Sequence, residues 1–287
     1  MENKVFREGI ETNRSKKNSA LEFLYNTTVG RIVLKLAVSP CISKSVGKFL
    51  DSRLSARLID GFIKKKDIDM SMCEKDSFKS FNDFFTRRLK QEARPFDSNP
   101  NKLCSPCDSK LLVYKINEDS TFDIKNSTYT IAELLRSKKL AEKYNNGWCF
   151  VYRLEPTDYH RYAYIDNGVK TRNFYIKGVF HTVQPIAMNA YPVFKRNSRE
   201  FTMLKTENFG DVIQIEVGAM LVGKITNFHD KHRYVRGEEK GMFEFGGSTI
   251  VQLFTEGTVY PDSDIIINSI NSQETQIKMG EVIASRQ

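Results

Sequence analysis

The chain has 287 residues, of which 40% are hydrophobic and 28% are charged, so we expect a globular protein with a packed core. Its formal net charge of +9 favours an anionic partner, which could be nucleic acid, acidic lipid or an acidic metabolite. A transmembrane helix needs about 20 consecutive apolar residues. The sequence contains no such run, so no transmembrane helix is predicted.

The cysteines point to a reducing environment. There are five of them, at positions 41, 73, 104, 107 and 149, and the first residues lack the apolar stretch of a signal peptide. We therefore expect free thiols in a protein on the cytosolic side of the membrane. Cys104 and Cys107 form a CxxC pair, but zinc needs further ligands at similar spacing, so no metal site is expected.

Residues 1 to about 95 carry helical patterns. Apolar side chains recur every three or four residues from Leu21 to Leu36, which predicts an amphipathic helix that Pro40 interrupts. Further helices are predicted over residues 43–65 and 80–91, the second starting after Ser80 as an N-cap.

From about residue 103, short runs of Val, Ile, Phe and Tyr alternate with Gly, Asn, Asp and Pro, a pattern typical of a mostly antiparallel β domain. Strands are predicted at residues 111–114, 149–153, 212–217, 249–254 and 264–267, with one helix at 130–144. The predicted fold class is therefore α+β, with a helical N-terminal region over residues 1–100 and a β-rich domain over residues 101–287.

Four segments carry residues capable of chemistry. They are Phe-Phe-Thr-Arg-Arg-Leu-Lys at 84–90 with Arg-Pro-Phe-Asp at 94–97, Ser-Pro-Cys-Asp-Ser at 105–109, Leu-Glu-Pro-Thr-Asp-Tyr-His-Arg at 154–161 continuing to Asp-Asn-Gly at 166–168, and Phe-Glu-Phe-Gly-Gly-Ser-Thr at 243–249. Each segment alone has an ordinary structural interpretation. Gly-Gly-Ser is usually a turn, and a single histidine is more often structural than catalytic. A catalytic triad cannot be read from composition, because it is defined by geometry.

Taken together and in this order, the four segments resemble the phosphatidylserine decarboxylase family, over nearly the whole chain from about residue 30 onward. The resemblance implies that Ser248, with His160 as general base and Asp108 assisting, attacks the carbonyl of Gly247. The chain would then be cut between Gly247 and Ser248 into residues 1–247 and 248–287. Ser248 would become a pyruvoyl group, the cofactor of the enzyme.

The family chemistry also implies what the cofactor does. The pyruvoyl group is expected to form a Schiff base with phosphatidylserine and to accept the electrons released with carbon dioxide, which yields phosphatidylethanolamine. The candidate catalytic residues are thus Asp108, His160 and Ser248. One position departs from the family pattern: many members have a second histidine three residues after His160, where this chain has Ala163. Either His160 does both jobs, or another group replaces the second histidine.

The expected partners are phosphatidylserine, an anionic membrane surface, and the large and small chains of one precursor. We expect a peripheral protein on the cytoplasmic side of the cell membrane, where basic residues near the N-terminal helix would face anionic lipid: Lys16, Lys17, Arg31 and Lys35. The same helix could instead pack on the β domain. No nucleic acid is expected, because no recognition motif for it is present. A homodimer is among the oligomeric states that the sequence leaves open.

Two other functions fit parts of the sequence. The first is a decarboxylase-like protein that binds acidic phospholipid without turnover, which the departure at Ala163 would favour. The second is a serine hydrolase, but its nucleophile elbow needs a glycine two residues after the serine, and Ile250 stands there. The other histidines, His181, His229 and His232, are predicted to be surface or strand residues.

Overall fold

The structure, a computed structural model, describes residues 6–11, 19–27, 30, 40–124, 127–179, 181, 193–218, 224–246 and 248–286. The predicted apolar stripe beyond Thr27, apart from Gly30, lies outside these residues, as do Lys16, Lys17, Arg31 and Lys35.

Helices dominate the first hundred residues and recur as short pieces later. The α-helices are α1 (Ser19–Asn26), α3 (Pro40–Leu50), α4 (Ile59–Lys66), α5 (Phe81–Phe85), α6 (Ile131–Leu135), α7 (Lys138–Ala141), α9 (Val193–Arg196) and α10 (Ser263–Ile270). Three segments are 3-10 helices: η2 (Arg53–Leu58), η3 (Gln91–Ala93) and η4 (Glu142–Tyr144). Among the described residues, no helix combines the length and apolar composition needed to cross a bilayer.

The strands form one large sheet and three small ones. The large sheet has the order β1-β17-β3-β6-β15-β11-β10-β8-β13, with β9 beside β10. Its strands are β1 (Gly9–Glu11), β3 (Ser109–Lys115), β6 (Trp148–Leu154), β8 (Gly168–Lys170), β9 (Phe174–Ile176), β10 (Arg199–Thr206), β11 (Asp211–Val217), β13 (His232–Tyr234), β15 (Ser248–Phe254) and β17 (Gln273–Ile277).

The small sheets have the orders β12-β14-β7, β16-β18-β2 and β4-β5. Their strands are β2 (Lys102–Cys104), β4 (Thr121–Ile124), β5 (Ser127–Thr130), β7 (Arg161–Ala163), β12 (Ile225–Asn227), β14 (Glu239–Phe243), β16 (Val259–Pro261) and β18 (Val282–Arg286). Every pairing between these named strands is antiparallel. The predicted α+β class with mostly antiparallel sheets is therefore confirmed.

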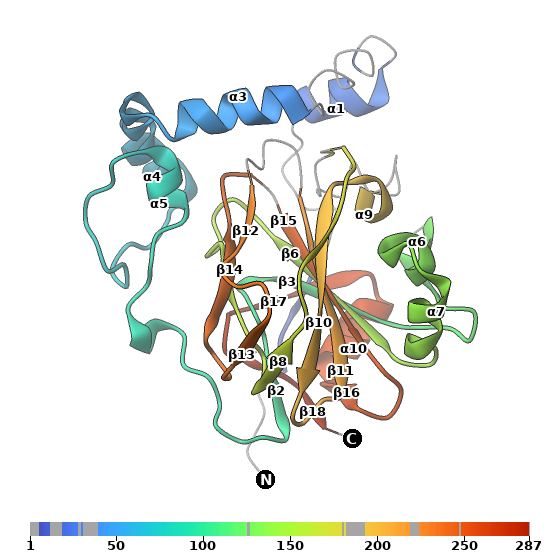
Figure 1. Ribbon diagram of the computed structural model, residues 1–287. Helices are drawn as coiled ribbons and strands as arrows, with labels where there is room; N and C mark the ends of the chain where they lie inside the picture. The colour runs from blue at the N-terminus through green and yellow to red at the C-terminus, as the bar shows by residue number, and fades with distance from the viewer. Residues whose placement is uncertain are drawn as a thin grey trace.

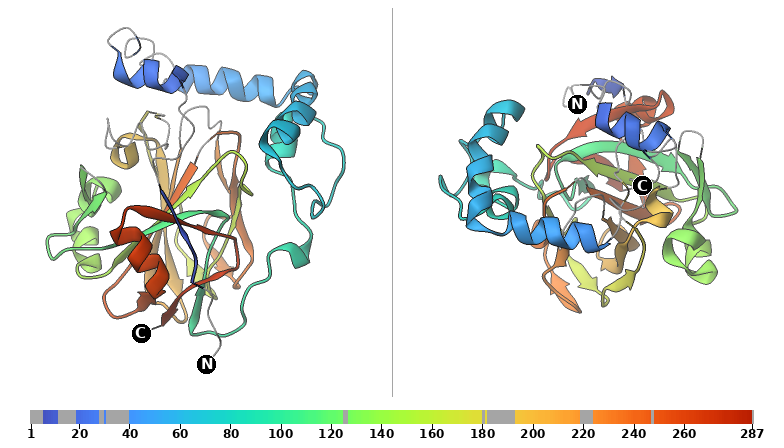
Figure 2. Two further views of the ribbon diagram at one scale, coloured as in Figure 1. Left: turned by 180° about the vertical axis from the view of Figure 1, so that it is seen from behind. Right: turned by 90° about the horizontal axis from the view of Figure 1, so that it is seen from above.

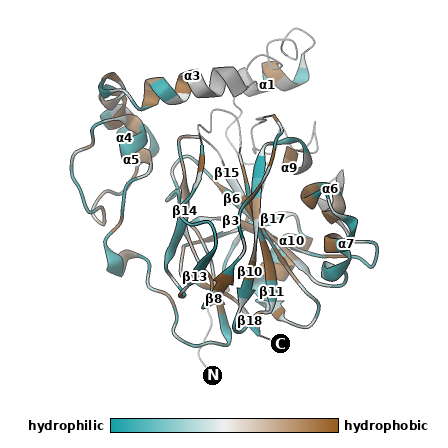
Figure 3. Cartoon of the chain, in the orientation of Figure 1, coloured by the Kyte–Doolittle hydropathy of each residue, from teal (hydrophilic) through white to brown (hydrophobic). Residues whose placement is uncertain are grey.

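The core lies on both faces of the large sheet, because side chains alternate along each strand. In β15, Val251 and Leu253 join one buried cluster, while Ile250 and Phe254 join the other. All seven residues of β15 are buried, as expected for a strand with neighbours on both edges and packing on both faces. Apolar residues accordingly follow the strands through the centre of the molecule (Figure 3).

The helices lie around this sheet structure. Helices α1 and α3 run across one end of the β domain, α4 and α5 lie at its side, and α6 and α7 cover another side (Figure 1). Viewed from behind, α10 packs across the large sheet (Figure 2), where it contacts β3 and β17. A separate cluster of Leu50, Ile59, Phe81, Phe84 and Phe85 holds the helical region together.

The prediction of a strand at residues 264–267 is wrong, because these residues lie in α10. The isoleucine run favours a strand locally, but Ile265 is buried against the sheet while Ile267 and Ile270 face solvent. Asp264 lies in the first turn, where a negative charge suits the helix dipole, and its carboxylate accepts from the backbone N–H of Ile265. Packing across β3 and β17 thus outweighs β propensity.

The N-terminal prediction of helix is wrong for residues 9–11, which form β1 and pair with β17. Arg7 explains why the chain is held there. Its guanidinium nitrogens lie 2.6 Å from Asp264 Oδ2, 2.8 Å from Asp262 Oδ2 and 3.1 Å from Glu281 Oε1. These ion pairs and the edge of β17 give the segment partners that a short isolated helix would lack.

Three predicted helices are shorter or more broken than expected. The helix predicted at 43–65 is divided into α3, η2 and α4. The helix predicted at 80–91 starts after the N-cap Ser80 but ends at Phe85, because residues 88–90 bond to the backbone of residues 72–74. The helix predicted at 130–144 is divided into α6, α7 and η4. Arg136 has a left-handed φ of 51° that ends α6, and Ser137 then caps α7.

Candidate active site

Ser248 is the first residue of β15 and is fully buried. Its Cα lies opposite that of Leu154, the last residue of β6, so the loop after β6 passes close to it. Gly246, two residues earlier, has a φ of 139°, which side-chain-bearing residues rarely adopt. Gly247, the other residue of the predicted cleavage site, lies outside the described residues.

A tight turn after β6 places His160 against Ser248. The carboxylate of Asp158 accepts from the Glu155 backbone N–H at 2.7 Å, and the Glu155 carbonyl oxygen lies 2.9 Å from His160 Nε2. A carbonyl only accepts, so Nε2 carries the proton and Nδ1 carries the lone pair. His160 Nδ1 lies 3.5 Å from Ser248 Oγ, in position to accept the hydroxyl proton.

Aromatic side chains enclose the histidine. The ring of Phe85, from α5, stacks on His160 with 4.0 Å between ring centroids, and Phe245 packs against Phe85 at 5.1 Å. Burial, with a smaller contribution from the charge of Arg87, lowers the pKa of His160 to about 3. At neutral pH the imidazole is therefore uncharged and available as a base.

Asp108 is near this pair but is bonded elsewhere. Arg94 binds its carboxylate with both Nε (2.7 Å) and Nη2 (2.5 Å), and the Met279 backbone N–H donates at 2.8 Å. Among the described residues, no hydrogen bond joins Asp108 to His160. The structure thus brings His160 and Ser248 together and leaves Asp108 as a neighbouring charge, which raises the pKa of His160 against the effect of burial.

Ala163, the position at which the resemblance implies a second histidine, is buried in β7. It lines a cavity of about 260 Å³ together with Arg94, Tyr159 and Met279. Arg94 and Met279 are the residues that hold Asp108. Position 163 therefore shares a cavity with the partners of Asp108.

Arg87 is a site residue to which the sequence assigned no role. Its side chain is buried, and its guanidinium carbon lies 5.1 Å from the centre of the Phe84 ring. Within the described part of the chain, its Nε and Nη1 atoms have no hydrogen-bond partner. Burial lowers its pKa, and the Cys73 thiol counteracts this most, with a smaller contribution from Asp108. Two buried donors without partners beside His160 suit an anionic group of a ligand.

The segment at 84–90 and Arg94 belong to the motifs identified in the sequence, but their roles were not predicted. In the structure, Phe85 stacks on His160 and Arg94 binds the carboxylate of Asp108. The carbonyl of Glu155 carried no sequence signal, because any residue supplies one. Cys104 and Cys107 are buried free thiols.

Comparison with known proteins gives the family. The phosphatidylserine decarboxylase family model matches residues 81–285. The chain belongs to the phosphatidylserine decarboxylase family. It is 49% identical over 268 residues to phosphatidylserine decarboxylase proenzyme 2 of Clostridium acetobutylicum, covering 93% of this chain and 92% of that protein. The proenzymes of Clostridium botulinum strain 657 and Clostridium beijerinckii are 43% and 42% identical, with the same coverage.

Proposed function

We propose that the chain is a phosphatidylserine decarboxylase proenzyme that cuts itself between Gly247 and Ser248 to make a pyruvoyl group. Membership of the family and the proenzyme names of its relatives support the reaction class. The observation that carries the proposal is the contact between His160 Nδ1 and Ser248 Oγ in a buried site next to a glycine with positive φ.

The cut needs a base and a nucleophile. Ser248 Oγ loses its proton to His160 Nδ1 and attacks the Gly247 carbonyl carbon, which converts the peptide bond into an ester. The ester then eliminates, which leaves a carboxylate on Gly247, and the former serine nitrogen departs as ammonia when water is taken up. The low pKa of His160 disfavours a lasting imidazolium, and the Ser248 nitrogen takes up the proton as its bond to the Gly247 carbonyl carbon breaks.

The pyruvoyl group derived from Ser248 would supply a ketone that takes up the electron pair left when carbon dioxide departs. His160 would deliver the proton to the carbon atom from which carbon dioxide has left. Asp108 and Arg94 would keep a charge pair near the site, and Arg87 would bind an anionic group of phosphatidylserine. Product release would give phosphatidylethanolamine.

The helical region over residues 1–100 would be the part that meets the membrane, and residues 101–287 the catalytic domain. Exposed apolar side chains at Phe49, Leu54 and Leu58 alternate with exposed basic residues on α3 and η2. Such a surface suits peripheral binding to anionic lipid at the cytoplasmic side of the cell membrane.

Intact mass spectrometry of the purified protein tests the proposal. Pyruvoyl formation adds a water and loses an ammonia, so the two fragments should together exceed the precursor by about 1 Da, compared with about 18 Da for plain hydrolysis, as an ester resolved by elimination requires. Ser248→Ala should give one uncut chain. His160→Ala and Asp108→Ala should accumulate precursor. A difference of about 18 Da would disprove the pyruvoyl assignment, and a Ser248→Ala protein cut at the same bond would remove Ser248 as nucleophile.

A further inference from the structure

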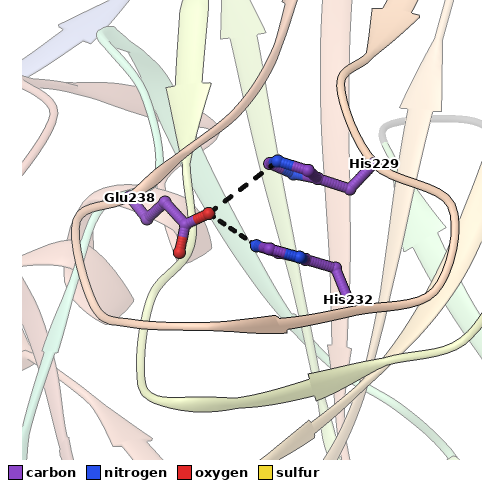
Figure 4. Close-up of side chains that lie close together, drawn as sticks. All are labelled: His229, His232 and Glu238. Carbon is purple, nitrogen blue, oxygen red and sulfur yellow. Dashed lines mark hydrogen bonds and ion pairs between the residues drawn. The ribbon is translucent and has the colours of Figure 1, made fainter.

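Two histidines and a glutamate converge at the edge of the large sheet, away from Ser248. His229 lies in the loop after β12, His232 begins β13, and Glu238 lies just before β14. The two imidazole rings stack with centroids 3.8 Å apart and an interplanar angle of 8°. Both direct a ring nitrogen towards the carboxylate of Glu238 (Figure 4).

The spacing of these atoms fits one metal ion. Glu238 Oε1 lies 2.6 Å from His232 Nε2 and 3.9 Å from His229 Nε2, and the ligand atoms all lie within 4.8 Å of one another. Tetrahedral zinc with bonds of about 2.0–2.1 Å needs its ligand atoms roughly 3.3 Å apart. The two observed distances bracket this value, so small side-chain rotations would admit the ion.

Outer contacts already orient the glutamate and one of the histidines. The Val235 backbone N–H donates to Glu238 Oε2 at 3.1 Å, which leaves Oε1 to face the histidines. Tyr164 Oη lies 3.4 Å from His229 Nδ1, and a proton on Nδ1 would leave the Nε2 lone pair for a metal. Partners of this kind fix ring orientation in metal sites.

The backbone of the His229 loop is held as well. The His229 carbonyl accepts from Lys170 Nζ at 2.7 Å and from Asn173 Nδ2 at 3.0 Å. The side chains of His229 and Glu238 are each 30% exposed, so solvent can reach the cluster. A water could therefore complete the coordination of the ion.

We propose that His229, His232 and Glu238 form a binding site for one transition-metal ion of the zinc type. A set of two imidazoles and one carboxylate favours zinc over magnesium or calcium, because magnesium and calcium bind mainly to oxygen ligands. The ion joins β13, the last strand of the large sheet, to β14 of a small sheet. Beyond β14 the chain continues to Gly246 and Ser248, so the ion stabilises the turn between β13 and β14 that precedes the cleavage segment.

Zinc chloride titrated into the uncut Ser248→Ala protein tests the site by calorimetry and by thermal unfolding. We expect one equivalent to bind, the midpoint of unfolding to rise, and magnesium to have no such effect. Cobalt bound in place of zinc should give the visible absorption of a tetrahedral ion.

Glu238→Gln preserves the size of the side chain and removes its charge. This substitution, and likewise His229→Ala and His232→Ala, should each abolish the rise in the unfolding midpoint that zinc produces. The loss in affinity should exceed the roughly 10- to 100-fold typical of an outer-shell change, which is the loss expected for Tyr164→Phe. Lys231→Ala, between the two histidines, is the matched control and should bind zinc normally. Absence of stoichiometric zinc binding, or zinc binding that survives all three ligand changes, would overturn the proposal.

Discussion

The imidazole of His160 lies between the ring of Phe85 and the first residue of β15, out of contact with solvent. Burial lowers its pKa from 6.5 to about 3, so the folded protein prefers the neutral form. The unfolded chain binds the proton more readily. The stability contributed by this group is therefore complete above pH 6.5 and is lost as the pH falls towards 3, at up to about 1.4 kcal/mol per pH unit.

We expect the free energy of unfolding of the Ser248→Ala precursor to fall more steeply from about pH 7 to pH 5 than that of a Ser248→Ala, His160→Gln precursor. Chemical denaturation at each pH measures the difference. Burial also lowers the pKa of His181, to about 4, but both proteins contain it, so the comparison isolates His160. Parallel pH profiles would contradict a buried neutral imidazole.

Arg87 should contribute to substrate binding, because two of its buried nitrogen atoms lack partners among the described residues. An anionic group of phosphatidylserine would satisfy them, and a charged hydrogen bond is worth about 1.5–3 kcal/mol. We expect Arg87→Leu to raise KM by roughly 10- to 100-fold, with a smaller effect on kcat. Steady-state decarboxylation of phosphatidylserine in mixed micelles measures both constants.

Arg172→Leu is the matched control, since Arg172 is exposed and does not line the cavity that Ala163, Arg94 and Tyr159 share. Arg87→Lys keeps the charge and should recover part of the affinity, though not the geometry of the guanidinium. If Arg87→Leu leaves KM unchanged and lowers only thermal stability, Arg87 is a packing residue.

At the scale of single elements, the sequence predicted four adjacent strands of the large sheet, β3, β6, β15 and β11, because they carry runs of β-branched and aromatic residues, and it missed the shorter strands. It failed at α10 and β1, where distant partners decide: Arg7 joins the two through Asp264 and Asp262. The candidate site was also only partly predictable. The order of the motifs predicted that His160 and Ser248 lie together. The hydrogen bonds from Arg94 and Met279 to Asp108 join segments far apart in the chain, which the spacing of the motifs does not reveal.

Helix α3 and the following turn η2 present the surface that we expect to meet the bilayer. Leu54 and Leu58 are 64% and 48% exposed and lie beside exposed Arg53 and Arg57. Each leucine would gain about 1.5–3 kcal/mol if it were fully buried in lipid. Leu54→Asp with Leu58→Asp should therefore weaken binding to phosphatidylserine vesicles at least tenfold, measured by sedimentation.

Ile270→Asp is the control for this surface, because Ile270 is 77% exposed on α10, away from α3 (Figure 2). Binding by the unsubstituted protein should also weaken in high salt, which screens the basic residues. Equal losses in the double variant and in Ile270→Asp would argue against α3 and η2 as the docking surface.

For the whole molecule, the position of the proposed cut within the sheet decides the fate of the two chains. Residues 248–287 would contribute β15, β16, α10, β17 and β18. Strand β15 lies between β6 and β11, and β17 lies between β1 and β3, all four of which belong to the larger chain. The small chain has no neighbour of its own for either strand.

We therefore expect the two chains to remain one folded particle after the cut. Ile250, Val251, Leu253 and Phe254 of β15 are all fully buried, and their burial stabilises the pairing by roughly 6–12 kcal/mol as an upper estimate. Size-exclusion chromatography in native buffer should give a single peak that contains both chains. They should separate only in denaturant, at the concentration where the β signal in circular dichroism is lost. Recovery of a folded large chain free of the small one in native buffer would contradict this interlocked arrangement.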